Sequence, residues 1–265
     1  MVKKKSIPVI GVPVVNGVHW VKRLMLSIDY PVDNLFIINN NGRGEIDEEL
    51  DKLKNISNKF IKNIHITHLP SNLGVPAAWN LIIKSFLMEP YWIISNHDVA
   101  FSPGLLKEFS DMAQDKEISM IHPRAGENNV GTYDLFAITE MGVRIVGLFD
   151  ENLYPAYGED TDYIMRVLNL DPKKCLGFNN TYLHGEEIAD CVNYEKNGQQ
   201  TSKEEPQMKE KLDRVDEKNY EYLTKKWGKN WRELSPCKHP FDNKEYSNSY
   251  TSWDLDYIRN KYLGF

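Results

Sequence analysis

The sequence is poor in cysteine, has no long apolar run and carries no excess of positive charge. Its three cysteines, Cys175, Cys191 and Cys237, lack the paired spacing of a metal site, so we expect no disulfide framework and a reducing compartment, the cytoplasm. No apolar run approaches the roughly 20 residues that cross a bilayer, so we expect no transmembrane segment. The net charge of −6 disfavours nucleic acid as a partner, because non-specific binding to phosphates needs clustered positive charge.

What is present is the composition of a globular protein, with 41% hydrophobic and 26% charged residues. The length of 265 residues suits one α/β domain with an appendage, or two small domains. The N-terminus combines a basic start with an apolar stretch, as a signal peptide does, but Pro8, Gly11 and Pro13 interrupt the stretch and no small-residue cleavage site follows. We therefore expect a buried first strand there.

Short apolar runs alternate with segments of helical period as far as about residue 185. The predicted strands are Ile7–Val15, Leu35–Ile38, Ile64–Leu69, Tyr91–Ser95, Ile118–His122 and Leu135–Thr139, with further short strands at Cys175–Phe178 or Thr181–Leu183. Helices are predicted between them, within 18–28, 45–62 and 77–88 and after Ser102. This alternation predicts an α/β fold with a mostly parallel sheet flanked by helices. We expect a core at 1–185 and, at 186–265, a flexible loop (186–206) followed by a helical, aromatic extension packed on the core.

Polar residues directly follow several predicted strands, where ligands of parallel sheets bind. Asp98, with Asn96 and His97 before it, suits a hard divalent cation that also binds phosphate oxygens, although Asp after a strand is also ordinary turn chemistry. The segment Asn72–Gly74 opens a helix, where backbone N–H groups either receive an anion or simply form a turn. His184 follows another short strand, and a lone histidine is more often structural than a ligand.

Three carboxylates, Glu159, Asp160 and Asp162, lie within four residues at a predicted helix start. Crowded carboxylates raise one another's pKa, which suits a general base that accepts a proton from a substrate hydroxyl. The alternative is structural: acidic residues are favoured at a helix N-terminus, and Asp162 pairs with Arg166 at a spacing of four. The sequence alone does not decide between these roles.

Taken in order, these elements resemble the GT-A-fold nucleotide-sugar glycosyltransferases, especially family two, over about residues 6–185. The resemblance lies in Val12-Pro13-Val14-Val15-Asn16, Asn39-Asn40, Asn72-Leu73-Gly74 with Asn80, Asn96-His97-Asp98, Gly147-Leu148-Phe149-Asp150-Glu151 and Glu159-Asp160-Thr161-Asp162 with Arg166. It implies a mixed, mostly parallel GT-A sheet. The residues that it implies for nucleotide binding are Pro13, Val15, Asn16, Asn39, Asn40, Asn72, Gly74, Asn80, Asn96 and His97.

The resemblance also implies Mn²⁺ or Mg²⁺ on Asp98 and His184, and Asp160 as the catalytic base. Glu159 and Asp162 would orient Asp160 or bind sugar hydroxyls. The implied reaction moves a hexose or pentose from a nucleoside-diphosphate sugar to a hydroxyl of a glycan, glycoconjugate or other acceptor, with inversion at the anomeric carbon.

Two departures from the family pattern concern the donor. A UDP-type donor is favoured by the resemblance, but Asn39 replaces the acidic residue that contacts a uracil N–H, which leaves the base open. Asn96 replaces the first carboxylate of the metal motif, which weakens metal binding without the nucleotide.

Two other functions stay open. A nucleotidyltransferase is disfavoured because residues 16–20 lack the glycine-rich basic loop that grips a triphosphate. A non-catalytic carbohydrate-binding protein of the same fold is the second alternative.

Overall fold

The computed structural model describes residues 5–123, 133–170, 175–178, 182–185, 187–189 and 206–231. Its main sheet has the order β3-β2-β1-β4-β7-β6-β8. These strands are Ile7–Val14 (β1), Val32–Asn39 (β2), Ile61–His68 (β3), Tyr91–Ser95 (β4), Met120–His122 (β6), Leu135–Thr139 (β7) and Cys175–Gly177 (β8). A small antiparallel sheet joins Val99–Phe101 (β5), Tyr182–His184 (β9) and Glu187–Ala189 (β10).

The helices are Val18–Ser27 (α1), Asp47–Lys52 (α2) with the 3₁₀ turn Leu53–Asn55 (η1), Val75–Ser85 (α3), Leu105–Met112 (α4), Glu140–Ile145 (α5), Glu159–Leu170 (α6) and Pro206–Trp227 (α8). Strands β3, β2, β1 and β4 run parallel, whereas β7 is antiparallel to both β4 and β6. The predicted α/β fold with a mixed, mostly parallel sheet is therefore confirmed.

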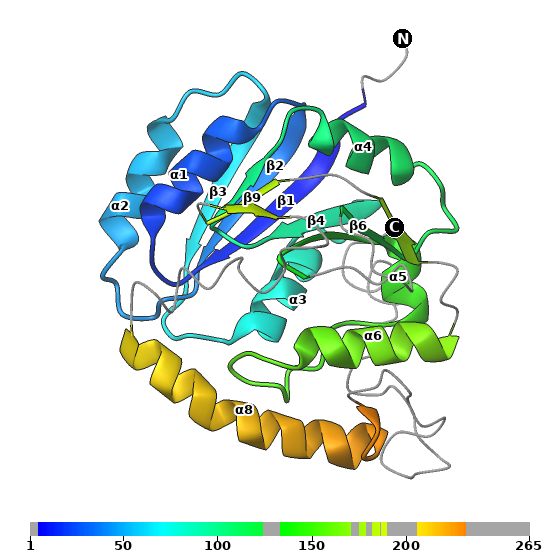
Figure 1. Cartoon of the computed structure of the whole chain (residues 1–265). Coiled ribbons are helices and arrows are strands. Elements are labelled where there is room, and N and C mark those ends of the chain that lie inside the picture. Colours follow the sequence, from blue (N-terminus) through cyan, green and yellow to red (C-terminus); the bar gives the residue numbers. More distant parts are fainter. Residues whose placement is uncertain are drawn as a thin grey trace.

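Helices cover both faces of the sheet (Figure 1). On one face, Leu24 of α1 packs in one core cluster with Ile10 and Val12 of β1. On the other face, Ile82 of α3 packs in a second cluster with Val9. Successive residues of β1 thus enter opposite cores, as the two-residue period of a strand requires, and covering on both faces explains why the run is apolar throughout.

Gly11 sets how closely α3 approaches β1. A Cβ atom at Gly11 would lie 2.4 Å from Cγ2 of Ile82, so a larger residue would force the helix away from the strand. The helix that follows the Asn72–Gly74 segment is thereby held against β1.

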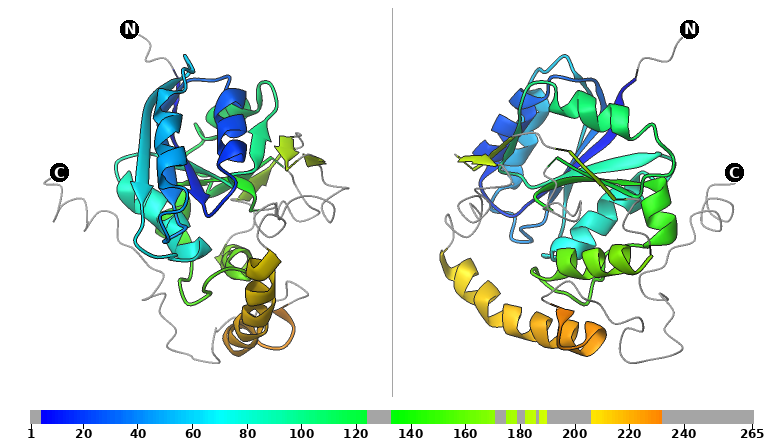
Figure 2. Two further views of the ribbon diagram at one scale, coloured as in Figure 1. Left: turned by 90° about the vertical axis from the view of Figure 1, so that its left-hand side faces the viewer. Right: turned by 45° about the vertical axis from the view of Figure 1, so that its right-hand side comes forward.

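Helix α8 lies alongside α6, as the views in Figures 1 and 2 agree. Leu223 and Trp227 of α8 pack with buried residues of the α6 region in a third hydrophobic cluster. Gly158, with a φ of 96°, directly precedes α6, and a Cβ atom there would lie 2.8 Å from Cδ1 of Leu223. The first turn of α6 is therefore packed directly against α8.

Most predicted strands are confirmed within a few residues, and β4 and β7 to the residue. The helix and connection predicted within 45–62 are present as α2 and η1, followed by residues 56–60 before β3 begins at Ile61. The sequence does not predict β5, α5 or β10, which are too short for a periodic pattern to show.

Two predictions fall largely outside the described residues. Of the loop expected at 186–206, only 187–189 and 206 are described, and the aromatic tail is described only to Trp231. The division into 1–185 and 186–265 stays a prediction. In the described part of the chain, none of the helices combines the length and apolar character that a membrane crossing requires.

Candidate functional site

Helix α6 begins beside a cavity of about 410 Å³. The lining residues are Tyr157, Gly158, Glu159, Asp160, Thr161, Tyr220 and Trp231. Tyr157 has a φ of 73°, in the left-handed region that bulky residues rarely adopt. Asn219 of α8 holds this turn, since its Nδ2 donates to the carbonyl oxygens of Ala156 and Tyr157 at 2.8 and 2.9 Å. Strained backbone that is held by its surroundings is typical of functional sites.

Asp160 is half-buried on the wall of this cavity. Burial raises the pKa of its carboxyl above the ordinary value, and the backbone N–H and hydroxyl of Thr161, at 2.6 and 3.3 Å from Oδ1, only partly oppose this. A carboxylate with a raised pKa is a stronger proton acceptor than an exposed one. Glu159 lies buried at the same cavity.

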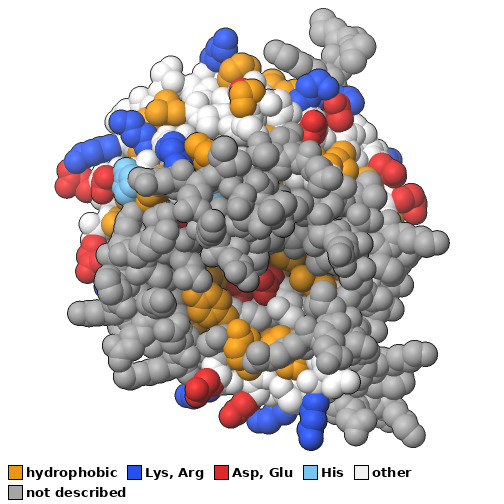
Figure 3. All heavy atoms as spheres, in the orientation of Figure 1, with side chains coloured by type: hydrophobic (Ala, Val, Ile, Leu, Met, Phe, Trp, Pro, Cys, Tyr) orange, Lys and Arg blue, Asp and Glu red, His pale blue; other side chains and the backbone are white. Residues whose placement is uncertain are grey.

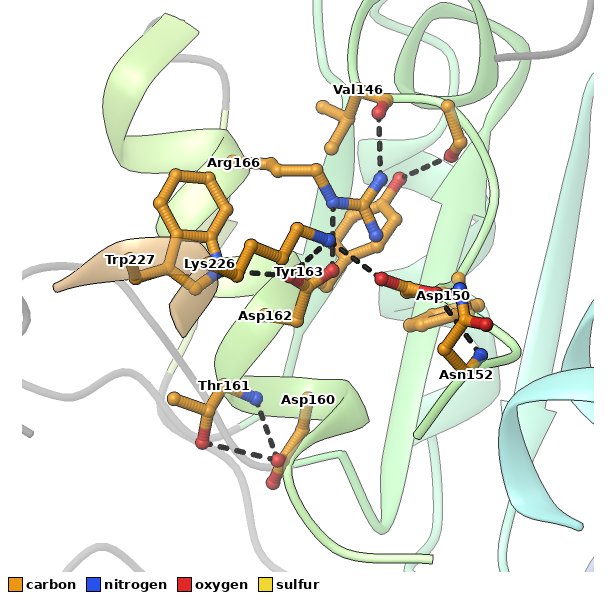
Figure 4. A network of polar contacts seen from close by, with 12 residues as sticks. Val146, Asp150, Asn152, Asp160, Thr161, Asp162, Tyr163, Arg166, Lys226 and Trp227 are labelled. Atoms are coloured by element: carbon orange, nitrogen blue, oxygen red, sulfur yellow. Dashed lines mark hydrogen bonds and ion pairs between the residues drawn. The ribbon is translucent and has the colours of Figure 1, made fainter. Parts of the chain in front are cut away.

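Asp162 lies two residues further on but faces the interior, away from the direction of Asp160 (Figure 4). Its carboxylate accepts a hydrogen bond from Nε of Arg166 at 3.0 Å, and Nζ of Lys226 lies 2.7 Å from its other oxygen. Lys226 also donates to Asp150 at 2.7 Å, and all of these side chains are buried. The structure therefore does not bring Asp162 to the cavity with Asp160.

The charges of this buried network balance one another. Burial by itself would raise the pKa of Asp150, but the charge and hydrogen bond of Lys226, together with the Tyr222 hydroxyl, outweigh it and leave the pKa below its ordinary value. Asp162 forms an ion pair with Arg166, four residues further along the helix. For Asp162, the structural role considered from the sequence is therefore present.

The pairing of β5 with β9 brings Asp98 and His184 together. Val99, the first residue of β5, pairs with His184, and Nε2 of His184 lies 3.2 Å from Oδ1 of Asp98. The backbone N–H of Gly185 donates to the carbonyl oxygen of Asp98 at 2.9 Å. The small second sheet thus connects two residues that are distant in the sequence.

Asp134 is a third member of this cluster, and no pattern in the sequence singles it out. Its Oδ2 lies 3.1 Å from Nδ1 of His184. Asp134 stands just before β7, whose antiparallel pairing places Leu135 opposite Ser95 at the end of β4. The sequence does show a carboxylate just before a predicted strand. It indicates a site residue only if that strand is antiparallel, because its start then lies at the same edge of the sheet as the carboxyl end of β4.

The electrostatics of this cluster follow from its two carboxylates. Burial would lower the pKa of His184, but hydrogen bonds and charges of Asp134 and Asp98 raise it to about 9. Burial would likewise raise the pKa of Asp98, but His184 outweighs it and leaves the pKa low.

An oxygen of Asp98 and a nitrogen of His184 face each other, and these are donor types that Mn²⁺ or Mg²⁺ accepts. Asp134 approaches the opposite ring nitrogen and so cannot share the same ion. Within the described ranges, no three His, Cys, Asp or Glu side chains group into a metal site. The pair therefore fits an ion whose other ligands come from phosphate and water.

The residues predicted to bind the nucleotide lie at the carboxyl ends of the parallel strands or in α3. They are Pro13, Val15 and Asn16 at the end of β1, Asn39 and Asn40 at the end of β2, Asn72 and Gly74 before α3, Asn80 in α3, and Asn96 and His97 after β4. Several of these side chains hold loops. Asn40 accepts from the N–H of Leu73 at 2.8 Å and donates to the carbonyl of Gly74, and Asn80 exchanges two hydrogen bonds with the backbone of Phe149.

Asn39 is also engaged within the protein. Its Nδ2 donates to Oδ1 of Asp47 at 2.6 Å and lies 3.0 Å from Nδ1 of His68, while its oxygen accepts from the N–H of Asn41. The side chain is 1% exposed. This position favours a role in fixing the end of β2 over direct contact with a base.

The loop before α6 packs against the opening of α3. The N–H of Val75 donates to the carbonyl of Pro155 at 2.6 Å, and the Tyr154 hydroxyl donates to the carbonyl of Asn72 at 3.2 Å. Gly74 is required here, since its φ is 82° and a Cβ atom would lie 2.9 Å from the Pro155 oxygen. The loop that leads into the cavity at the start of α6 is thus in contact with the segment before α3, which lies near the carboxyl ends of the strands. On the face in Figure 3, acidic side chains lie in a hollow edged by hydrophobic ones.

Three comparisons with known proteins agree with this architecture. The family model described as "Glycosyl transferase family 2" matches residues 10–179. A galactofuranosyl glycosyltransferase of Leishmania donovani is 25% identical over 68% of this chain and 56% of its own. The crystal structure of S. aureus TarS is similar at a TM-score of 0.50 and 12% identity, over 66% of this chain and 36% of that one. The chain thus spans little more than half of the L. donovani protein and about a third of TarS, and the likeness to TarS shows the GT-A fold alone.

Proposed function

This chain belongs to glycosyl transferase family 2, and we propose that it transfers a sugar from a nucleoside-diphosphate sugar to an acceptor hydroxyl, with Asp160 as the general base. The observation that carries the proposal is the position of Asp160 on a cavity wall, with a pKa raised by burial. A general base has to be ionised near its substrate and is more effective as its pKa approaches the working pH.

In the proposed step, the acceptor oxygen forms a bond to the anomeric carbon while the bond from that carbon to the diphosphate breaks. The electron pair of the broken bond leaves with the nucleoside diphosphate, and the hydroxyl proton moves to the carboxylate of Asp160. Attack from the side opposite the leaving group inverts the anomeric carbon. Glu159, at the same cavity, would hold a sugar hydroxyl.

Asp98 and His184 would hold Mn²⁺ or Mg²⁺ beside the diphosphate. When bound, such an ion neutralises the negative charge that develops on the leaving group. Oδ2 of Asp134 lies 3.1 Å from Nδ1 of His184, so that Nε2 is the ring nitrogen that faces Asp98. A carboxylate beside the second ring nitrogen orients metal-binding histidines in other proteins.

The donor base stays open, because the amide of Asn39 is already bonded to Asp47. The L. donovani relative is named for galactofuranose, so a UDP-linked hexose is the first donor to test. The acceptor would be a glycan, a glycoconjugate or another hydroxyl compound.

The test is the Asp160→Asn variant. We expect transfer to fall by about 10²–10⁴-fold, the usual contribution of a general base. Donor binding, measured as the rise in Tm with nucleoside diphosphate and Mn²⁺, should be retained. Asp115→Asn, which removes an exposed carboxylate on another loop, is the matched control and should transfer normally.

Full transfer by Asp160→Asn would end the assignment of the base. If no nucleoside diphosphate raised the Tm of the parent protein with or without Mn²⁺, the donor class itself would be wrong. Release of pyrophosphate in place of nucleoside diphosphate would instead identify nucleotidyl transfer. Sugar binding without donor turnover would identify a carbohydrate-binding protein.

A further inference from the structure

We propose that the cavity between the start of α6 and α8 is the acceptor subsite and that it takes a sugar ring, so that the acceptor is a glycan or glycoconjugate. This inference rests on the proposed function, since it names the substrate that would meet Asp160. It also assigns a binding role to α8, which lies beyond the match to the family model at 10–179.

The lining of the cavity has the two kinds of surface that a sugar ring needs. Tyr157, Tyr220 and Trp231 supply aromatic rings, whose negative faces attract the weakly positive C–H groups on the flat side of a sugar. Glu159 and Asp160 supply carboxylate oxygens, which accept hydrogen bonds from the hydroxyls at the edge of the ring. The volume of about 410 Å³ lies within the range of about 300–1,000 Å³ typical of small-ligand sites.

The aromatic wall is held in place before any ligand arrives. The rings of Tyr220 and Trp231 lie 5.3 Å apart at 36°, and Nε1 of Trp231 donates to the Thr224 hydroxyl at 3.0 Å. On the other side, Asn219 fixes the backbone of Tyr157. A preformed wall lowers the ordering cost of binding and keeps the seated ring in register with Asp160.

Other acceptor classes fit this lining less well. A serine or threonine hydroxyl on a protein presents no flat C–H face to stack on three aromatic rings. A nucleic acid would bring phosphates towards the carboxylates of Glu159 and Asp160, which repel them. A sugar ring uses both surfaces at once, and a lipid-linked sugar presents the same ring.

The first experiment uses methyl hexopyranosides and methyl hexofuranosides as probes, with glycerol and a serine-containing peptide as acceptors without a sugar ring. Saturation-transfer NMR on the full chain should show binding of at least one methyl glycoside through its ring C–H protons. The same glycoside should accept sugar in a transfer assay, and glycerol and the peptide should not. Transfer to the peptide but to no glycoside would overturn the inference.

The second experiment tests the wall itself. Tyr220→Ala should raise the KM for the best methyl glycoside by about 10-fold or more, and Tyr220→Phe should restore most of it, because stacking needs the ring and not the hydroxyl. Trp231→Ala and Trp231→Phe form a second pair, with donor binding reporting whether each variant is folded. Lys229→Ala, an exposed neighbour, is the matched control.

The outcomes separate the two proposals. If the parent protein neither binds nor turns over a nucleotide sugar, the proposed function fails. If the donor is bound and slowly hydrolysed by water while no methyl glycoside binds, only the sugar-acceptor inference fails. An unchanged KM in a folded Tyr220→Ala variant would likewise refute the aromatic wall.

Discussion

The carboxylates on the two sides of the first turn of α6 have different surroundings: a buried network with cations on one side and a cavity on the other. In the buried network, Asp162 and Asp150 each contact the ammonium group of Lys226, and the pKa of Asp150 is held below its ordinary value. At the cavity, Asp160 is bonded by Thr161 next to it, and burial raises its pKa. Residues two positions apart on a helix point about 200° apart, so one turn supplies both surroundings. A carboxylate buried with a cation keeps a low pKa and anchors the structure, whereas one buried without a cation has a raised pKa, which suits the proposed proton acceptor.

The largest effect on stability is expected in the buried network, where the carboxylates are paired with a cation. Lys226→Met removes the cation shared by Asp150 and Asp162 and leaves two carboxylates buried. We expect the free energy of unfolding to fall by about 3–5 kcal/mol, the usual cost of breaking a buried ion pair. Urea unfolding measures it.

Lys225→Met is the control for that variant, because Lys225 is the exposed neighbour on the same helix, and it should unfold like the parent. A Lys226→Met protein as stable as the parent would show that the network does not anchor α8 to the core.

On the cavity side, the rate of transfer should depend on pH through Asp160. In the proposed reaction, Asp160 accepts a proton only when it is ionised, and burial holds its pKa above the ordinary value of 3.8. As the pH falls through the raised pKa, the ionised fraction and kcat/KM for transfer should fall together, so the acid limb lies above pH 3.8. The residual activity of Asp160→Asn should lack this limb, and an identical limb in the variant would assign it to another group.

The smallest effect tests how the cavity depends on α8. Asn219→Ala removes the donor to the carbonyls of Ala156 and Tyr157, at a cost of about 1–3 kcal/mol in unfolding free energy. The released turn at Tyr157 should raise the acceptor KM more than it changes donor binding. Glu221→Ala on the same helix, at an exposed position, is the control. Equal changes in the two binding constants would argue against a specific role for this turn.

Predictability from the sequence varied between the parts of the site. The position of Asp98 after an apolar strand and of Asp160 at a helix start followed from local periodicity, and the structure confirms both local placements. The roles of Asn40 and Asn80 did not follow, since each side chain bonds to a loop that is remote in the sequence. Asp134 was missed because only the antiparallel pairing of β7 brings it to His184.

The sequence by itself determined the alternation of strands and helices, because a period of two or of 3.6 residues is written in neighbouring side chains. It also placed three carboxylates in one helical turn. Only the tertiary structure decided that Asp162 would meet Lys226 and Asp160 would not, because that depends on where α8 packs. The charge of a buried group is set by partners that lie far along the chain, and these partners cannot be predicted from the spacing of residues along one helix.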